Sequence, residues 1–168
     1  MMKTSRILII SAFAVAVMFF SSGAAQAVFQ MDMDSNLVDF RTMDNGESRE
    51  LADQGVFHNQ FSCTSDNDRT WYFKSRLVRS FSSMGNTIPD ENFRWKVVSK
   101  GEGKGIVTNN VNTENQFTKD DRVIYTSAET DNTGTQVDLQ LRYLLTIPKR
   151  QLTGSYDAIV RFTMIETP

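Results

Sequence analysis

The stretch VDLQLRYLLTI, residues 137–147, decides the fold class, because an apolar side chain falls on every second residue. The odd positions from Val137 to Ile147 are apolar or aromatic, and the even positions are polar except Leu144. A period of two is typical of a strand with one buried face, whereas a helix repeats every 3.6 residues. Pro148 follows, and it lacks the N–H that a sheet ladder needs. The sequence therefore predicts a strand over 137–147.

The same alternation recurs along most of the chain. It predicts further strands over 156–165, 56–64, 70–81, 93–97, 122–126 and 37–41. Clusters rich in Gly, Asn and Asp separate these segments, and such residues favour turns. We find no window with helical periodicity over three turns. Short strands at this spacing predict an all-β, antiparallel sandwich in one domain, residues 37–168.

Residues 1–27 have the three regions of a secretory signal peptide. Lys3 and Arg6 precede the apolar run 7–20, in which only Ser11 is polar. Ala25 and Ala27 then form an A-x-A site, which predicts cleavage before Val28. A membrane anchor is the alternative, but it needs roughly 20 apolar residues. We therefore expect an exported mature chain, 28–168, in the periplasm, at the cell surface or outside the cell, with no membrane span of its own.

Charge and composition exclude several functional classes. Lys and Arg number 18 against 20 for Asp and Glu, so the net charge is -2. Loss of Lys3 and Arg6 makes the charge of the mature chain -4, which does not fit a basic nucleic-acid-binding protein. One Cys and one His exclude an internal disulfide framework, a Cys-rich zinc module and a multi-His metal site. We expect no cofactor, no metal and no catalytic site.

Cys63 lies on the predicted strand 56–64, on the same face as Phe57 and Phe61. The favoured interpretation is a buried, small apolar side chain. The alternatives are an intermolecular disulfide and a reactive thiol. His58 should point to the opposite face, so the two side chains do not predict a Cys–His catalytic pair.

Two other segments resemble fragments of ligand-binding loops. Asp66-Asn67-Asp68 is similar to part of a calcium loop, but the glycine and distal Glu of an EF-hand do not follow. Lys96, Lys100 and Lys104 lie around the glycine-rich segment 101–105, which lacks the Gly-Lys-Ser/Thr ending of a phosphate loop. We interpret 66–68 as a turn and 101–105 as a hairpin connection.

Trp71, Tyr72 and Trp95 are aromatic residues that could stack on a sugar ring. In a sandwich, however, large aromatic residues on strands more often fill the core. We therefore expect Trp71 and Trp95 to be buried.

The segment directly after the predicted cleavage site is the strongest functional candidate. Phe29, Met31 and Met33 alternate with polar residues over 28–36. One interpretation is a first strand of the domain's own sheet. The other is a donor strand that inserts into the sheet of a neighbouring subunit, with Phe29, Met31 and Met33 filling pockets there.

Three short motifs resemble one family. Leu37-Val38-Asp39-Phe40 before an Asn-Gly turn is similar to its opening strand, and Ser62-Cys63-Thr64 is similar to the end of its next strand. The segment IPKRQLTGSYD, residues 147–157, resembles its closing I-P-x-x-Q…G-x-Y-x-D pattern. Together they resemble the spore coat U domain of archaic chaperone–usher pilus subunits. Arg41 stands where that family has glycine, 28–36 lacks the family's second Cys, and 82–135 matches no motif of it.

The resemblance implies an Ig-like β-sandwich of seven to nine strands that assembles by donor-strand complementation. Its implied partners are copies of itself or related pilus subunits, and a periplasmic chaperone that protects an exposed sheet edge. The leading hypothesis is thus an exported, non-catalytic structural or adhesive surface subunit. The alternative is a monomeric carbohydrate- or peptide-binding module that uses the loops of 82–135. A hydrolase is disfavoured by the single His and by the absence of a paired-carboxylate motif.

Overall fold

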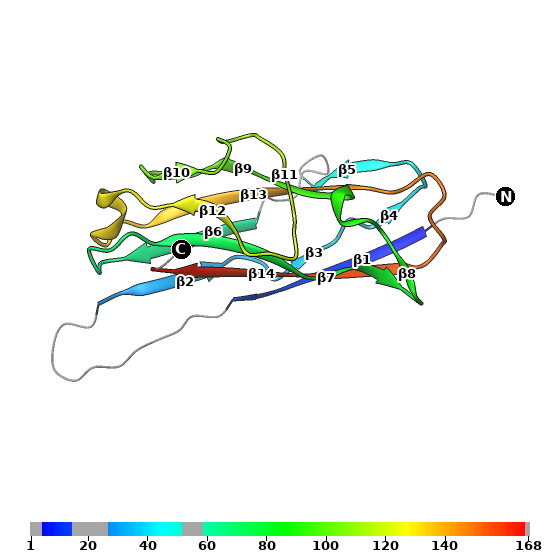
Figure 1. Cartoon of the computed structure of the whole chain (residues 1–168), viewed down its shortest axis with the longest axis horizontal. Coiled ribbons are helices and arrows are strands. Elements are labelled where there is room, and N and C mark those ends of the chain that lie inside the picture. The colour runs from blue at the N-terminus through cyan, green and yellow to red at the C-terminus, as the bar shows by residue number, and fades with distance from the viewer. Residues whose placement is uncertain (1–4, 15–26, 52–58, 167–168) are drawn as a thin grey trace.

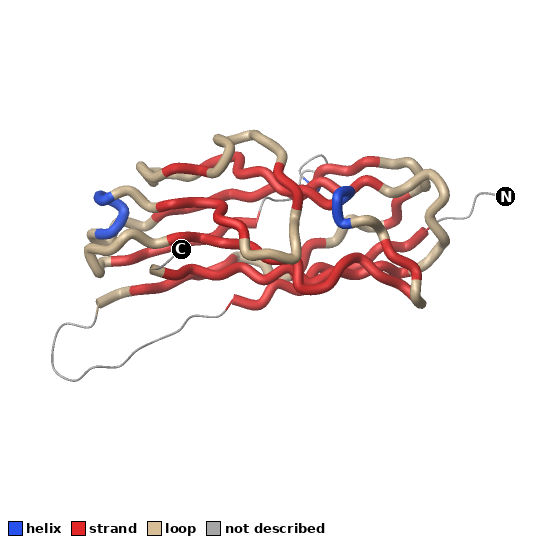
Figure 2. The backbone as a smooth tube through the Cα atoms, viewed as in Figure 1, coloured by secondary structure: helices blue, strands red, loops and turns tan. Residues whose placement is uncertain are grey.

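The computed structural model describes residues 5–14, 27–51 and 59–166, and it confirms the predicted all-β sandwich. Its strands run along the long axis of the molecule in two layers (Figure 1). Two short 3-10 turns, Asp90–Asn92 and Glu129–Asn132, are the helical elements seen in Figure 2. No helix within these described ranges is long and apolar enough to cross a membrane.

Sheet A has eight strands, and its main path is β10-β12-β7-β14-β1-β3. Strand β4 also pairs with β1, and β8 pairs with β7. The bounds are β1 Ser5–Ala14, β3 Leu37–Val38, β4 Thr42–Met43, β7 Tyr72–Ser83, β8 Asn86–Thr87, β10 Ile106–Val107, β12 Arg122–Thr126 and β14 Ser155–Ile165.

Sheet B has six strands, and its main path is β11-β9-β13-β6-β2, with β5 also paired to β13. All of its pairs are antiparallel. The bounds are β2 Phe29–Met33, β5 Ser48–Glu50, β6 Asn59–Ser65, β9 Phe93–Ser99, β11 Asn115–Gln116 and β13 Val137–Thr146.

The long predicted strands are confirmed, and the short one at 37–41 is interrupted. Strands β13 and β14 match the predictions over 137–147 and 156–165 to within one residue at each end. Strand β6 covers the second half of the prediction over 56–64, and residues 56–58 lie outside the described ranges. Strand β3 stops at Val38, and the chain turns where Arg41 has φ 56°. The Asp39 carboxylate accepts the Arg41 N–H at 2.7 Å and stabilises this turn.

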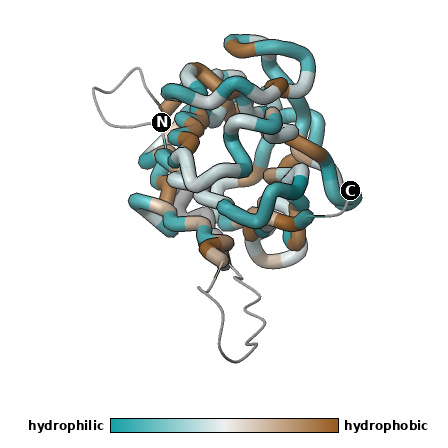
Figure 3. Tube along the Cα trace, turned by 90° about the vertical axis from the view of Figure 1, so that its left-hand side faces the viewer, coloured by the Kyte–Doolittle hydropathy of each residue, from teal (hydrophilic) through white to brown (hydrophobic). Residues whose placement is uncertain are grey.

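The core lies between the two sheets and is rich in aromatic rings. Phe61 of sheet B packs on Phe73 and Phe162 of sheet A, with ring centroids 4.8 and 4.6 Å away. Trp71 and Trp95 are buried in the same core, as expected. Buried and half-buried residues alternate along β13 and β14, and the end-on tube in Figure 3 mixes hydrophobic and hydrophilic residues accordingly. The alternation read from the sequence is therefore the alternation between core and solvent.

The glycine-rich segment 101–105 is not the hairpin that the sequence predicts. It leaves β9 in sheet B and enters β10 in sheet A, so it crosses between the two layers. Gly105 lies so close to β12 that a Cβ atom there would be 2.1 Å from the Thr126 carbonyl oxygen. The prediction was wrong because the two flanking strands find their hydrogen-bond partners in different sheets, which the local pattern does not encode.

Candidate functional site

The feature that bears most directly on function is the position of β1. This strand comes from the apolar run of the predicted signal peptide, and it lies inside sheet A beside β14 (Figure 1). The pair β1–β14 is parallel, with partners from Arg6↔Ser155 to Ala14↔Phe162. Every other strand pair in the described part of the chain is antiparallel.

On its other side, β1 is the only described strand that holds β3 and β4 in the sheet. Ile10 and Ser11 pair with β3, and Ser5 and Arg6 pair with β4. Strands β3 and β4 have two residues each and pair with no other described strand. Among the described strands, sheet A is thus continuous from β14 to β3 and β4 only through β1.

Apolar side chains surround this position on both sides. The inward face of β14 presents alternate buried residues, and so does the segment that carries β3 and β4. Phe40 in that segment also packs edge-on against Phe81 and Phe93, with ring centroids 6.4 and 6.3 Å away. The buried side chains are Tyr156, Ala158, Val160, Phe162 and Met164 on β14, and Val38, Phe40 and Met43 opposite. A strand between β14 and β3–β4 therefore covers one edge of the core.

The three donor-strand candidates lie in the other layer. Phe29, Met31 and Met33 belong to β2, the edge strand of sheet B, which pairs antiparallel with β6. Met31 is buried beside Cys63, and Phe29 and Met33 pack on the core while half-buried. In this arrangement the segment 29–33 is a strand of its own domain, and as a donor it would have to leave β6.

Two of the three motifs that carry the family resemblance, the Asn-Gly turn after 37–40 and the segment 147–157, meet at one end of the sandwich. The Asn45 side-chain amide donates to the Gln151 carbonyl oxygen at 3.0 Å. The Gly46 N–H donates to the Ile147 carbonyl oxygen, also at 3.0 Å. The Gln151 amide also donates to the Tyr156 hydroxyl at 2.7 Å, and this hydroxyl donates to the Leu152 carbonyl oxygen at 2.8 Å. The polar residues of the two motifs thus fix the turn before β5 against the connection into β14.

Cys63 is buried in the centre of β6, as expected for a small apolar side chain. Burial raises the pKa of its thiol strongly, and the nearby carboxylates of Asp138 and Asp32 raise it further. A thiol held neutral in this way is a poor nucleophile. His58, the partner that a Cys–His pair would need, lies outside the described residues.

The segment 66–68 is the turn between β6 and β7, as interpreted from the sequence. Asp68 has φ 52°, a left-handed conformation that Asp tolerates in turns. Within the described ranges no three His, Cys, Asp or Glu side chains gather as they would around a metal ion.

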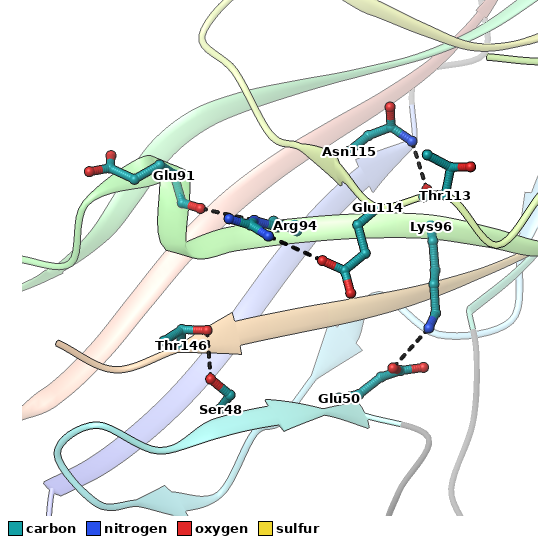
Figure 4. A network of polar contacts seen from close by, with 9 residues as sticks. All are labelled: Ser48, Glu50, Glu91, Arg94, Lys96, Thr113, Glu114, Asn115 and Thr146. Carbon is teal, nitrogen blue, oxygen red and sulfur yellow. Dashed lines mark hydrogen bonds and ion pairs between the residues drawn. The ribbon is translucent and has the colours of Figure 1, made fainter. Parts of the chain in front are cut away.

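A network of charged side chains covers the outer face of sheet B (Figure 4). The Glu50 carboxylate accepts a hydrogen bond from Lys96 at 2.9 Å and one from Arg142 at 3.3 Å, and Arg94 pairs with Glu114 at 3.2 Å. Partial burial raises the pKa of Glu50, but the two cations outweigh it and hold the pKa below its usual value. These charges satisfy one another, so we assign the network to the surface of the fold rather than to a ligand.

The buried carboxylate of Asp131 joins the crossover segment 101–105 to the turn before β13. The Asp131 carboxylate accepts hydrogen bonds from the N–H groups of Lys104, Gly105 and Ala128, each at 2.9 Å. The Tyr125 hydroxyl donates to it at 2.6 Å. All four partners are groups of the fold itself, which makes this a structural anchor.

The loops of 82–135 lack the aromatic rim that a sugar-binding surface would favour. All four aromatic residues in this fully described region are buried, namely Phe93, Trp95, Phe117 and Tyr125. Phe117 packs on Phe93 with ring centroids 4.4 Å apart, so its loop is folded back over the core.

Compared with known proteins, the chain matches no family model and no curated protein. The fold and the position of β1 are therefore the observations from which a function has to be argued. The sequence did not predict that β1 pairs with β14, β3 and β4. An apolar run shows that a segment avoids water, but it does not show which strand the segment will pair with.

Proposed function

We propose that this protein is an exported, non-catalytic structural subunit whose sheet A is completed by a strand from another protein. The observation that carries the proposal is that, within the described residues, β14 and the β3–β4 segment are joined only by β1, which lies inside the predicted signal peptide. Cleavage before Val28 would remove β1. The mature chain would then have an unpaired edge on β14 next to apolar core side chains.

The mature N-terminal segment has the length and pattern to fill that position. Strand β1 has ten residues, and 28–36 has nine, which at about 3.3 Å per residue covers about 30 Å. Its apolar residues Phe29, Met31 and Met33 alternate with polar ones, as required of a strand with one face on the core and one in water. Segment 28–36 of a neighbouring copy or related subunit is therefore the proposed occupant. A chaperone strand would occupy the position before assembly.

The left-handed turn at Arg41 also supports the resemblance to pilus subunits. The family has glycine at this position, and φ 56° is a conformation that favours glycine. The backbone at Arg41 thus has a conformation that would account for a glycine at this position, although the residue here is Arg.

The test compares four versions of the chain. They are 28–168; 36–168; 28–168 with a flexible linker and a second copy of 28–35 added after Pro168; and the same with Asp at the three apolar positions of the added copy. Light scattering and electron microscopy give the assembly state, and hydrogen exchange gives the protection of 155–162 on β14.

We expect concentration-dependent oligomers or fibres from 28–168 and none from 36–168. The added apolar segment should give a monomer with β14 protected, and the added polar segment should not protect β14. A stable monomeric 28–168 with β14 already protected would refute the proposal. The alternative binding module would then be tested on a sugar array.

A further inference from the structure

The peptide bond at which cleavage is predicted lies on the surface, at the start of β2. Ala27 and Val28 are both exposed, and β2 begins at Phe29. The Val28 N–H donates to the Asp66 carboxylate at 2.5 Å, and the Asp66 N–H donates back to the Val28 carbonyl oxygen at 3.0 Å. The second bond extends the β2–β6 ladder by one residue beyond the pair Phe29↔Ser65, and the first adds a side-chain contact at the same place.

We propose that Asp66 is the binding site for a new amino terminus that processing creates at Val28. Hydrolysis breaks the Ala27–Val28 C–N bond: water supplies OH to the Ala27 carbonyl carbon and H to the Val28 nitrogen. The products at neutral pH are a carboxylate on Ala27 and an ammonium group on Val28, because an α-amino group has a pKa of about 7.7–8.0. The hydrogen bond to Asp66 then becomes an ion pair.

The charges around this turn leave Asp66 available for that role. Arg69, the basic residue that ends the segment 66–69, pairs with Glu166 at 3.3 Å, and Asn67 also donates to Glu166. No cation among the residues that the structure describes forms an ion pair with Asp66. The new ammonium group would thus supply the missing positive charge at the atom where a hydrogen bond already exists.

The ion pair would hold the segment 29–33 on β6, and the proposed function needs this same segment as a donor strand. We call this restraint the latch. Segment 29–33 can pair with β6 of its own domain or with β14 of a neighbour, but not with both at once. An ion pair at its first residue favours the first state. This consequence rests on the proposed function, whereas the ion pair itself rests only on cleavage before Val28.

The experiment is a double-mutant cycle on the mature protein. One change adds Gly-Ser before Val28, which turns the Val28 nitrogen back into an amide and keeps its N–H. The other is Asp66→Asn, which keeps an acceptor oxygen and removes the charge. Asp68→Asn, in the same turn, is the matched control. Hydrogen exchange of residues 29–33, measured by mass spectrometry, reports how often β2 opens, whether or not the protein has assembled.

We expect the Gly-Ser extension to raise the opening equilibrium of β2 by about two- to five-fold, the range of an exposed ion pair. The extension should have no effect in the Asp66→Asn background and its full effect in the Asp68→Asn background. High salt should reduce the difference. An equal effect of the extension with and without Asp66 would overturn the ion pair.

Assembly kinetics test the latch separately. Asp66→Asn should speed the assembly of 28–168, and Asp68→Asn should not. Faster assembly only in Asp66→Asn supports the latch, and equal rates in all three proteins overturn it. If no version assembles while the exchange cycle shows coupling, the proposed function fails and the ion pair stands.

Discussion

Replacing Asp131 by asparagine should destabilise the sandwich and remove part of its dependence on pH. Asp131 is 1% exposed and accepts four hydrogen bonds. Its Oδ2 atom serves Gly105, Tyr125 and Ala128, and its Oδ1 atom serves Lys104. The carboxylate therefore holds the β9–β10 crossover against the turn before β13.

The magnitude follows from what an amide can accept. With its oxygen in the place of Oδ2, the Asn side chain keeps three donors but turns its NH₂ group toward the Lys104 N–H. One buried, unpaired N–H costs about 1–3 kcal/mol, and bonds to a neutral acceptor are weaker than bonds to a carboxylate. We expect Asp131→Asn to lower the free energy of unfolding by about 2–4 kcal/mol at pH 7.

The pH dependence has a definite sign. Burial raises the pKa of Asp131, but the hydrogen bonds from Lys104, Tyr125, Ala128 and Gly105 outweigh it and hold the pKa below its ordinary value of 3.8. A carboxyl whose pKa is lowered on folding stabilises the protein fully above its unfolded-state pKa. That stabilisation is lost as the pH falls through the folded-state pKa. The cost of Asp131→Asn should therefore shrink below about pH 4.

The assay is urea unfolding between pH 7 and pH 3, followed by the fluorescence of the buried Trp71 and Trp95. Asp121→Asn is the control, since Asp121 is exposed and its carboxylate pairs with Arg161 at 3.5 Å on the surface. Its effect should stay within about 0.5 kcal/mol. An Asp131→Asn cost as small as that of the control, or one that does not change with pH, would refute the reasoning.

Three further tests address single residues of the fold: Cys63, Gly105 and Arg41. Cys63 should not react with a thiol reagent in the folded protein and should react once urea unfolds it, since burial raises the pKa of its thiol; rapid reaction in the native state would contradict this. Gly105→Ala should cost more than about 3 kcal/mol in thermal or urea unfolding, because the Cβ atom would lie 2.1 Å from the Thr126 carbonyl oxygen. Gly85→Ala meets no atom within 4 Å and should cost only about 1–2 kcal/mol for its φ of 83°, so equal costs would count against a steric cause. Arg41→Val should lose about 1–2 kcal/mol and Arg41→Gly should lose none, because φ 56° disfavours a β-branched residue; a loss in both variants would show that the Arg41 side chain matters instead.

Much of the fold could be predicted because strand patterning is local. The alternation over 137–147 identifies the buried face of β13, and Tyr156 to Met164 does the same for β14. Side chains on a strand point alternately to opposite faces, so a run of ten residues shows which of them avoid water. For the same reason Trp71, Trp95 and Cys63 could be placed in the core before their neighbours were known.

The sequence by itself determined the longer strands between residues 59 and 165, their inward faces and a segment, 28–36, with the pattern of a donor. Only the tertiary structure decided that β9 and β10 lie in different sheets, that β2 pairs with β6, and that β1 separates β14 from β3 and β4. It also brought Val28 to Asp66, 38 residues further along the chain. The physical reason is that every strand offers the same backbone N–H and C=O groups. Which edges meet therefore depends on how the whole core packs, not on any local stretch.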